Sequence, residues 1–211
     1  MQAQEKTTAN HFDYENVFTW LQNTGVKTYG KNFIIHPEDK PVLKKLCSFF
    51  LKDEATASAL KINLEKGILL SGPVGCGKTS LMSLLRFLRQ AEDRFIIKSC
   101  RDVSFEFIQD GYEVIHRYSR QSFKNHEPKA YCFDDLGTEN NLKYFGNECN
   151  VMAEVLLSRY DLFVSRKLIT HLTTNLSASE IEQLYGNRVR SRMREMFNLV
   201  SFNKETKDKR V

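Results

Sequence analysis

The chain has 211 residues, of which 41% are hydrophobic and 27% are charged, and its formal net charge is +5 at pH 7. This length allows one domain with a substantial hydrophobic core and some additional chain, and the composition is typical of a soluble globular protein. The excess of positive charge is compatible with a polyanionic partner but does not require one.

The sequence lacks several features that would place it in other classes. No apolar run approaches the ~18 residues of a transmembrane helix, and residues 1–6 have no apolar signal-peptide core. Five scattered cysteines without a C-x-x-C pair argue against a disulfide framework or a zinc site and predict reduced thiols. We therefore expect a cytoplasmic protein that does not bind membranes.

Residues 1–59 are predicted to form an N-terminal helical segment and linker. A short helix is expected over residues 14–21, with its apolar residues on one face and its end before Gly25. A second helix is expected to begin at Pro41 and to reach about Leu51, because proline is favoured in the first turn and apolar residues then follow at helical spacing.

From Gly67 onward, short β-rich apolar runs alternate with helical stretches. The expected strands are 67–71, 94–99, 130–134, 168–173 and 198–202, and the expected helices between them are 78–90, 102–119, 149–166 and 177–195. This alternation predicts a three-layer α/β domain in which helices cover both faces of a parallel sheet. We assign residues 60–203 to this domain and residues 204–211 to a basic C-terminal tail.

The segment between the first expected strand and the next helix fits the phosphate-binding pattern G-x-x-x-x-G-K-[ST]. It reads Gly72-Pro73-Val74-Gly75-Cys76-Gly77-Lys78-Thr79, with Ser80 next in the helix. Glycines let backbone N–H groups approach phosphate oxygens, and the helix directs the positive end of its dipole at the same anion. Lys78 adds a charge for the β- and γ-phosphates, and the Thr79 hydroxyl is suited to Mg²⁺. We expect residues 72–80 to bind ATP.

Within this loop, Cys76 permits two interpretations. Its side chain need not touch the nucleotide, so an inert filler is the favoured one. The alternative is a thiol whose oxidation or alkylation blocks ATP binding.

Two carboxylates follow the hydrophobic strand that begins at Tyr131. In a parallel α/β sheet, such strand ends face the nucleotide crevice. Asp134 is suited to hold Mg²⁺ through water, and Asp135 is suited to orient the attacking water. The alternative is an ordinary solvated turn, which the phosphate-binding loop upstream disfavours.

The expected strand 168–173 ends in the polar residues Thr173-Thr174-Asn175. The Asn175 amide could bind the γ-phosphate or the attacking water, as oriented polar groups do in phosphoryl transfer. A simple turn is the alternative, because the next helix begins with a capping box formed by Ser177 and Glu180. The two interpretations are compatible.

Four arginines occur between positions 188 and 194. At ~100° per residue, Arg188 and Arg192 share one helix face, whereas Arg190 and Arg194 lie almost opposite and are expected to be solvated. The pair Arg188 and Arg192 precedes the last strand and is a candidate for arginines offered to the γ-phosphate of a neighbouring subunit. Such an arginine can raise turnover by ~10³–10⁵-fold.

Basic and aromatic side chains are interleaved in residues 101–124, as in grooves that bind single-stranded nucleic acid. Four residues recur at helical core spacing and are expected to pack in the core, namely Phe105, Ile108, Tyr112 and Ile115. Arg117, Arg120 and Lys124 are candidates for phosphate contacts.

The order of four motifs resembles one family. The phosphate-binding loop is followed by Asp-Asp-Leu-Gly, Thr-Thr-Asn-Leu-Ser and Tyr-Gly-x-Arg-x-x-Ser-Arg-Met. Over roughly residues 60–203 the chain is similar to the AAA+ ATPases of the DnaC/DnaI helicase-loader and IstB transposition-helper group, relatives of the DnaA initiator. The resemblance implies a five-stranded parallel sheet, with Walker A at 72–79 and Walker B at Asp134 and Asp135. It also implies sensor 1 at Asn175 and an arginine finger at Arg192, with Arg188 as its companion.

The resemblance also implies an activity and partners. Members of this group hydrolyse ATP with Mg²⁺, form ATP-dependent homo-oligomers, bind single-stranded DNA and act on a replicative helicase or a transposase. The chain departs from the family pattern in three ways. Asp135 replaces the glutamate of many AAA+ proteins, which implies slow hydrolysis. No C-terminal lid domain is expected. The N-terminal 60 residues show no clear match to the helicase-binding domain of the loaders.

Two alternatives come from other functional classes. One is a P-loop kinase of a small acceptor, which the arginine pair after Asn175 disfavours because a kinase needs its arginines in a lid over its own substrate. The other is a nucleotide-dependent scaffold without hydrolysis, which the shorter carboxylate of Asp135 motivates.

Overall fold

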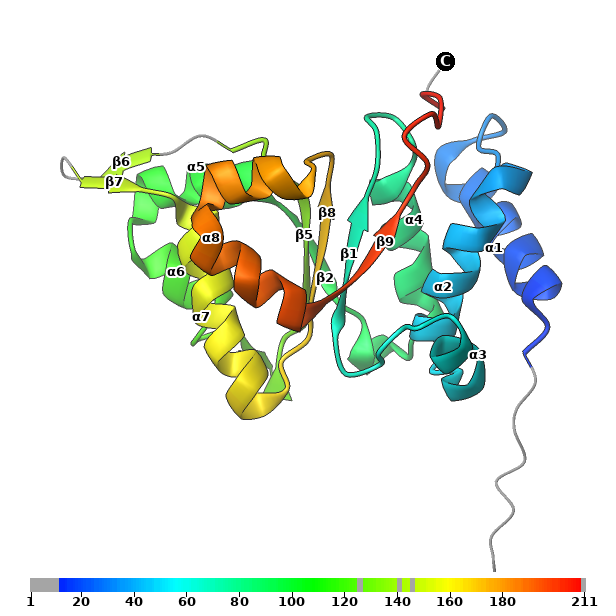
Figure 1. Cartoon of the computed structure of the whole chain (residues 1–211), viewed down its shortest axis with the longest axis horizontal. Helices are drawn as coiled ribbons and strands as arrows, with labels where there is room; N and C mark the ends of the chain where they lie inside the picture. The colour runs from blue at the N-terminus through cyan, green and yellow to red at the C-terminus, as the bar shows by residue number, and fades with distance from the viewer. Residues whose placement is uncertain (1–11, 125–126, 140–141, 145–146, 210–211) are drawn as a thin grey trace, which may run out of the picture. The chain divides into compact units, whose positions relative to one another are not determined.

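The computed structural model describes residues 12–124, 127–139, 142–144 and 147–209 (Figure 1). The chain divides into two compact units, Met1–Leu64 and Glu65–Val211. Within the described residues, no helix combines the length and the apolar character needed to cross a membrane.

The described part of the first unit is helical. Its elements are α1 (Tyr14–Tyr29), the 3-10 helix η1 (Pro37–Asp39), α2 (Lys40–Phe50) and α3 (Glu54–Ala59). The Asp13 carboxylate caps α1 by accepting hydrogen bonds from the N–H groups of Glu15 and Asn16. The Tyr14 hydroxyl donates to the Asp53 carboxylate at 2.6 Å, which joins the start of α1 to the start of α3.

Helix α1 passes through Gly25 and ends at Tyr29, so the prediction that it stops before Gly25 is wrong. Gly25 serves a contact instead: the ring of Phe33 packs against it, and a Cβ on residue 25 would lie 2.1 Å from Cε1 of Phe33. Gly30 caps the C-terminal end of the helix with a φ of 95°, which is unfavourable for other residues.

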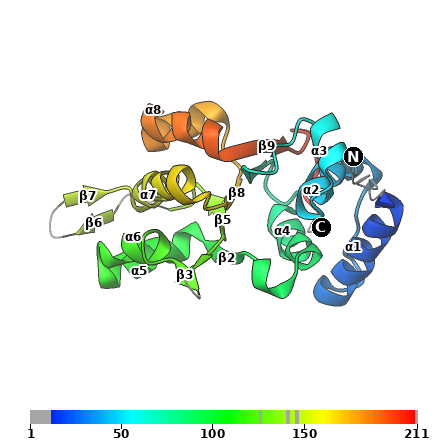
Figure 2. The same cartoon turned by 90° about the horizontal axis from the view of Figure 1, so that it is seen from below.

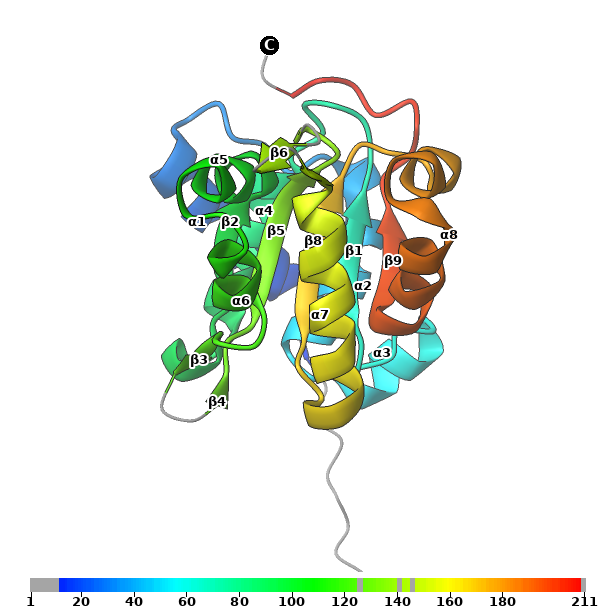
Figure 3. The same ribbon diagram turned by 90° about the vertical axis from the view of Figure 1, so that its left-hand side faces the viewer.

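The second unit contains a five-stranded parallel sheet in the order β2-β5-β8-β1-β9, which Figure 3 shows from left to right. Its strands are β1 (Gly67–Ser71), β2 (Ile96–Ser99), β5 (Tyr131–Leu136), β8 (Thr170–Thr174) and β9 (Phe197–Ser201). The predicted parallel sheet is thereby confirmed. Two short antiparallel hairpins were not predicted, and they pair β3 (Phe123–Lys124) with β4 (Glu127–Pro128) and β6 (Leu142–Tyr144) with β7 (Asn147–Cys149).

Helices cover both faces of this sheet. The α-helices are α4 (Lys78–Leu85), α5 (Cys100–Asp110), α6 (Glu113–Tyr118), α7 (Val151–Arg166) and α8 (Ala178–Met196), and the 3-10 helices are η2 (Arg86–Leu88) and η3 (Ala91–Asp93). Figures 1 and 2 show α4 on one face and α5 to α8 on the other. The unit is a three-layer α/β domain, as the alternation of strands and helices predicts.

The helix predicted over 102–119 is two helices, because Gly111 adopts a positive φ of 59° and ends α5. The break changes which residues reach the core. Of the four residues expected in the core, Ile115 is buried, but Phe105, Ile108 and Tyr112 are 56%, 58% and 46% exposed. The buried face of α5 is formed by Cys100, Val103, Ser104 and Phe107.

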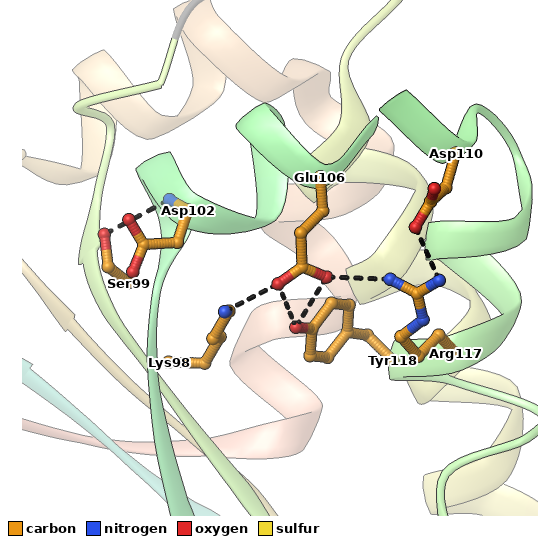
Figure 4. A network of polar contacts seen from close by, with 7 residues as sticks. All are labelled: Lys98, Ser99, Asp102, Glu106, Asp110, Arg117 and Tyr118. Atoms are coloured by element: carbon orange, nitrogen blue, oxygen red, sulfur yellow. Dashed lines mark hydrogen bonds and ion pairs between the residues drawn. The ribbon is translucent and has the colours of Figure 1, made fainter. Parts of the chain in front are cut away.

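A polar network around Glu106 joins α5, α6 and β2 (Figure 4). The Glu106 carboxylate accepts hydrogen bonds from Lys98 Nζ at 2.6 Å, Arg117 Nη1 at 3.0 Å and the Tyr118 hydroxyl at 2.9 Å. Burial raises the pKa of Glu106, but the hydrogen bonds from Lys98, Tyr118 and Arg117 outweigh it and lower this pKa below its ordinary value. Arg117 also pairs with Asp110 at 2.6 Å, so its guanidinium is engaged by two carboxylates of α5.

Arg159 fixes α7 against the sheet from a fully buried position. Its guanidinium donates to the Thr170 hydroxyl and to the Tyr118 carbonyl, each at 2.7 Å, and lies over the rings of Tyr131 and Phe133. Burial lowers the pKa of Arg159 to about 9. The side chain thus joins α6, α7 and β8 with one group.

His171 and Gly67 set the contact between β1 and β8. A Cβ on Gly67 would lie 1.6 Å from the Thr170 carbonyl oxygen, so only glycine allows this approach. The Ile68 N–H donates to Nδ1 of His171 at 3.1 Å, which requires a neutral ring with its proton on Nε2. Burial lowers the pKa of His171 to about 3, and the positive charges of Arg159 and Arg89 act in the same direction.

We expect His171 to make the fold sensitive to acid. Its pKa is about 3 in the folded chain and about 6.5 when unfolded, so its stabilising contribution is present above pH 6.5 and is lost as the pH falls towards 3. The free energy of unfolding should fall by about 1.4 kcal/mol per pH unit in this window through this residue. Urea denaturation between pH 7 and pH 5 measures the slope.

His171→Asn is the control, because its amide oxygen can still accept the Ile68 hydrogen bond but does not titrate. Its stability should be lower at pH 7 because ring volume is lost, yet its dependence on pH should be shallower. Equal slopes in the two proteins would show that His171 does not carry the acid sensitivity.

Candidate nucleotide-binding site

The phosphate-binding loop connects β1 to α4. Gly75 and Gly77 have positive φ angles of 77° and 94°, which turn successive backbone groups into the loop. Gly77 immediately precedes α4 and has no side chain that could cap the helix. The first N–H groups of α4 are thus available for an anion, as the motif predicts.

Lys78 connects the loop to the neighbouring strand. Its side chain is buried, and Nζ donates to the carbonyl oxygens of Gly72 and Pro73, each at 2.9 Å. Nζ also donates to Oδ1 of Asn175, which directly follows β8. Two residues singled out from distant parts of the sequence therefore touch.

Thr79 and Asp134 form the next contact. The Thr79 hydroxyl lies 2.9 Å and 3.1 Å from the two carboxylate oxygens of Asp134, to which it donates. Burial raises the pKa of Asp134 above its ordinary value; hydrogen bonds from Thr173 and Thr79 oppose this shift, Asp135 reinforces it and Lys78 opposes it. A cation beside this carboxylate would favour its ionised form.

The two residues fit the requirements of Mg²⁺. A hydroxyl and a carboxylate are the hard oxygen donors that this ion prefers, and they already lie side by side. In the described part of the chain, no cluster of three or more His, Cys, Asp or Glu could form a separate metal cage. Mg²⁺ commonly takes one or two protein oxygens and completes its shell with water and phosphate, so the Thr79 and Asp134 oxygens meet this requirement.

Thr173 is a site residue that the sequence analysis did not assign. Its hydroxyl donates to the Asp134 carboxylate at 2.6 Å and accepts a hydrogen bond from the Asp135 N–H at 2.9 Å. The residue can do this because β8 lies between β1 and β5 in the sheet. A polar threonine within a strand that is buried throughout could have indicated this role.

Asp135 adopts an uncommon backbone conformation. Its φ is 55°, in the left-handed region, and its carbonyl accepts a hydrogen bond from the Thr138 hydroxyl at 2.8 Å. Aspartate tolerates this region better than most residues, and such conformations concentrate at functional sites. The half-buried side chain follows directly after Asp134 at the end of the strand.

Arg188 and Arg192 do not join this group. Helix α8 is interrupted at Gly186, where φ is 81°, and both arginines lie in the part beyond it. Figure 1 shows α8 running from the loop end of the sheet towards the opposite end, where β9 begins. The Arg192 guanidinium lies over the ring of Tyr160 and donates to the Arg188 carbonyl at 3.4 Å, whereas Arg188 is exposed.

The segment after β9 lies on the phosphate-binding loop. Residues 202–209 contain no helix or strand, but the Lys209 N–H donates to the Gly75 carbonyl at 3.1 Å. The Asp208 carboxylate packs on Gly75 so closely that a Cβ on Gly75 would lie 2.0 Å from Oδ1 of Asp208. The predicted basic tail thus places an acidic side chain beside the anion-binding loop.

We expect Asp208→Asn to bind ATP about 3–10-fold more tightly than the wild type, because the substitution removes a negative charge that opposes the phosphates and keeps the side-chain shape. Titration with a fluorescent ATP analogue at low and high salt measures this, and screening should reduce the difference at high salt. Glu205→Gln is the control, since it removes the same charge from an exposed position in the same segment. An unchanged or weaker affinity of Asp208→Asn would contradict the expectation.

The loop, the carboxylate strand and the interposed β8 define a P-loop nucleoside-triphosphatase fold. Residues 68–200 match the sequence model of the ATPase family associated with various cellular activities (AAA). The chain belongs to this family. No curated protein matches the sequence significantly.

Solved structures share the fold at low sequence identity. The DnaC helicase loader is 18% identical, with a TM-score of 0.57, and the alignment covers 87% of this chain and 99% of that chain. DnaI is 17% identical, with a TM-score of 0.54 and coverages of 81% and 88%. AMPPCP-bound DnaA from Aquifex aeolicus is 17% identical, with a TM-score of 0.53 and coverages of 84% and 50%. The predicted membership of the AAA+ family is confirmed, and the likeness to DnaC and DnaI shows a shared fold.

Proposed function

We propose that the protein hydrolyses ATP with Mg²⁺ in an ATP-dependent homo-oligomer, and that it acts on DNA together with a protein client, as a helicase loader or a transposition helper. One observation carries the proposal. The groups proposed to bind phosphate and metal converge at one edge of the sheet, whereas the candidate arginines of the same chain lie on α8 beyond its break. This separation supports a site that a second copy completes with its arginines.

Each residue has a defined task in this scheme. Lys78 exchanges the carbonyl oxygens of Gly72 and Pro73 for the β- and γ-phosphates, while Asn175 is left beside the γ-phosphate. Thr79 and Asp134 would hold Mg²⁺, which neutralises charge that develops on the phosphates. Asp135 orients the attacking water. Arg192, assisted by Arg188, stabilises the transition state in the neighbouring subunit.

The outer face of α5 supports a contact with single-stranded DNA. Arg101, Phe105 and Ile108 follow one another at helical spacing, and Tyr112 comes just beyond the end of the helix. Exposed rings can stack on bases while an arginine neutralises phosphate. Their exposure removes the competing explanation that these side chains fill the core.

The cytoplasm is the compartment we propose for this activity. All five cysteines are free and buried, which agrees with reduced thiols. The likeness to a helicase loader and to DnaI supports the choice of a DNA-associated client, although at these identities it demonstrates the fold alone.

ATPase rate and sedimentation, measured together with and without single-stranded DNA, test the proposal. We expect slow turnover that rises with assembly or DNA, and that Asp135→Asn abolishes because the amide cannot accept a proton from water. A monomer that transfers phosphate to a small acceptor would instead identify a kinase. Nucleotide binding without turnover above background would identify a scaffold.

A further inference from the structure

We propose that Glu139 and Tyr185 are positioning residues that couple the nucleotide bound by one subunit to the orientation of the arginines which the same subunit offers to its neighbour. The proposal rests on the proposed function, in particular on Arg188 and Arg192 acting in trans. It adds a physical connection between the nucleotide site of a subunit and the part of α8 that carries its Arg188 and Arg192.

The connection begins in the turn after β5. Gly137 has a positive φ of 102°, and its N–H donates to Oε2 of Glu139 at 2.9 Å, which folds the Glu139 side chain back onto the turn. Asp135 lies two residues before Gly137, near the end of β5, and its N–H donates to the Thr173 hydroxyl. Residues 135–139 are called the Walker B turn below. Glu139 is thus fixed to the chain segment that holds the metal-binding and water-orienting carboxylates.

The turn also packs against the C-terminal end of β8 and the residues that follow it. The Thr174 hydroxyl donates to the Leu136 carbonyl at 2.7 Å, and a Cβ on Gly137 would lie 2.5 Å from the side chain of Leu176. A displacement of either segment by phosphate or Mg²⁺ therefore shifts the other, because the two are hydrogen-bonded and leave no room for a side chain between them.

The second oxygen of Glu139 accepts a hydrogen bond from the Tyr185 hydroxyl. Tyr185 is buried on α8, and burial together with the charge of Glu139 raises the pKa of its hydroxyl, so the group stays a donor. This hydrogen bond directly joins the Walker B turn to α8, one residue before the break at Gly186.

The first part of α8, residues 178–185, is consequently anchored at both ends. At its start, Ser177 and Glu180 form a capping box two residues after Asn175, whose amide oxygen accepts from Lys78. At its end, Tyr185 holds Glu139. The first anchor follows Asn175 closely in the chain, and the second is fixed to the turn that carries Asp135, so this part of the helix is placed to respond to the γ-phosphate.

Gly186 separates that part from the arginines. Its φ of 81° and ψ of 161° interrupt the helix, and a Cβ there would meet no atom within 4 Å. Packing therefore does not require glycine, whereas the backbone conformation does. A break of this kind lets Arg188 and Arg192 change direction when Tyr185 moves.

A fluorophore on the exposed position 191 tests the coupling within one subunit. The variant Ser191→Cys can be labelled selectively because the five native cysteines are buried. In dilute monomer, addition of a non-hydrolysable ATP analogue with Mg²⁺ should change the fluorescence. Introducing Tyr185→Phe should leave the affinity for the analogue within about twofold but should abolish most of this change. An undiminished change in Tyr185→Phe would overturn the proposal.

Tyr118→Phe is the matched control. It also removes a buried tyrosine hydroxyl that donates to a glutamate, but its partner Glu106 lies in the network of Figure 4 and not in the Walker B turn. A general effect of losing such a hydrogen bond would appear in both variants. Loss of the fluorescence change in Tyr118→Phe as well would also count against the proposal.

Turnover separates failure of this proposal from failure of the proposed function. In the assembled protein, Tyr185→Phe should lower kcat about tenfold and reduce the cooperativity for ATP, with KM little changed. If Arg192→Ala hydrolyses ATP normally, the arginines do not act in trans and the proposed function is wrong. If Arg192→Ala is inactive but Tyr185→Phe matches the wild type, the coupling alone is refuted.

Discussion

Replacing Arg192 with alanine is expected to leave ATP binding within about twofold of the wild type while lowering turnover by about 10³-fold or more. The reason is the position of Arg192: it contacts Tyr160 and Arg188, and it lies beyond Gly186 in the part of α8 that runs towards the start of β9. Its charge can therefore stabilise a transition state in a neighbour without contributing to nucleotide affinity in its own site. Equilibrium titration and steady-state ATPase assays separate the two quantities.

Arg194→Ala is the control for this experiment, because Arg194 is exposed on the same helix but faces almost the opposite direction. A mixing experiment sharpens the result further. Subunits of Arg192→Ala bind nucleotide, and subunits of Lys78→Ala still offer Arg192, so the mixture should regain part of the activity that each lacks. Normal turnover by Arg192→Ala, or a mixture with no more ATPase activity than its components, would show that Arg192 does not act in the site of a neighbouring subunit.

Replacing Lys78 with alanine is expected to weaken ATP binding by at least about 100-fold. Charge-assisted hydrogen bonds are each worth about 1.5–3 kcal/mol, and two to the phosphates correspond to two or more decades in Kd. The Lys78 side chain is buried within the loop and reaches both loop carbonyls, so its removal takes the positive charge out of the loop itself. Titration with a fluorescent ATP analogue measures the loss.

The thermal shift caused by ATP provides an independent check of this variant. A ligand that binds only the folded state raises the melting temperature, so ATP should stabilise the wild type and leave Lys78→Ala unchanged. Melting without nucleotide controls for damage to the fold. Retention of the ATP-dependent shift would mean that backbone N–H groups of the loop, and not Lys78, supply most of the affinity.

The parts of this molecule that were predictable from sequence depend on short-range patterns. The strand over 67–71 was predicted with the observed bounds, because an apolar run ends at a glycine-rich loop. The sequence analysis placed both Lys78 and Asn175 at the γ-phosphate, because each follows a strand of the expected parallel sheet; their direct contact is known only from the structure.

The parts that were not predictable depend on contacts between distant segments. The burial of α5 was misjudged because Gly111 ends the helix, and the apolar residues before it point outward. Thr173 was missed because its role requires knowing that β8 lies between β1 and β5. Nothing in the local sequence around Asp208 indicates that it packs against Gly75.

The position of the C-terminal segment has a practical consequence for biochemistry on this protein. Lys209 is hydrogen-bonded to Gly75, and Asp208 packs on the same glycine, so this segment is held on the phosphate-binding loop. A fluorescent label or a surface anchor attached within residues 202–209 would pull Asp208 away from the loop or crowd it. Rates and affinities measured on such a protein would then report the attachment as well as the site, so labels belong on other segments.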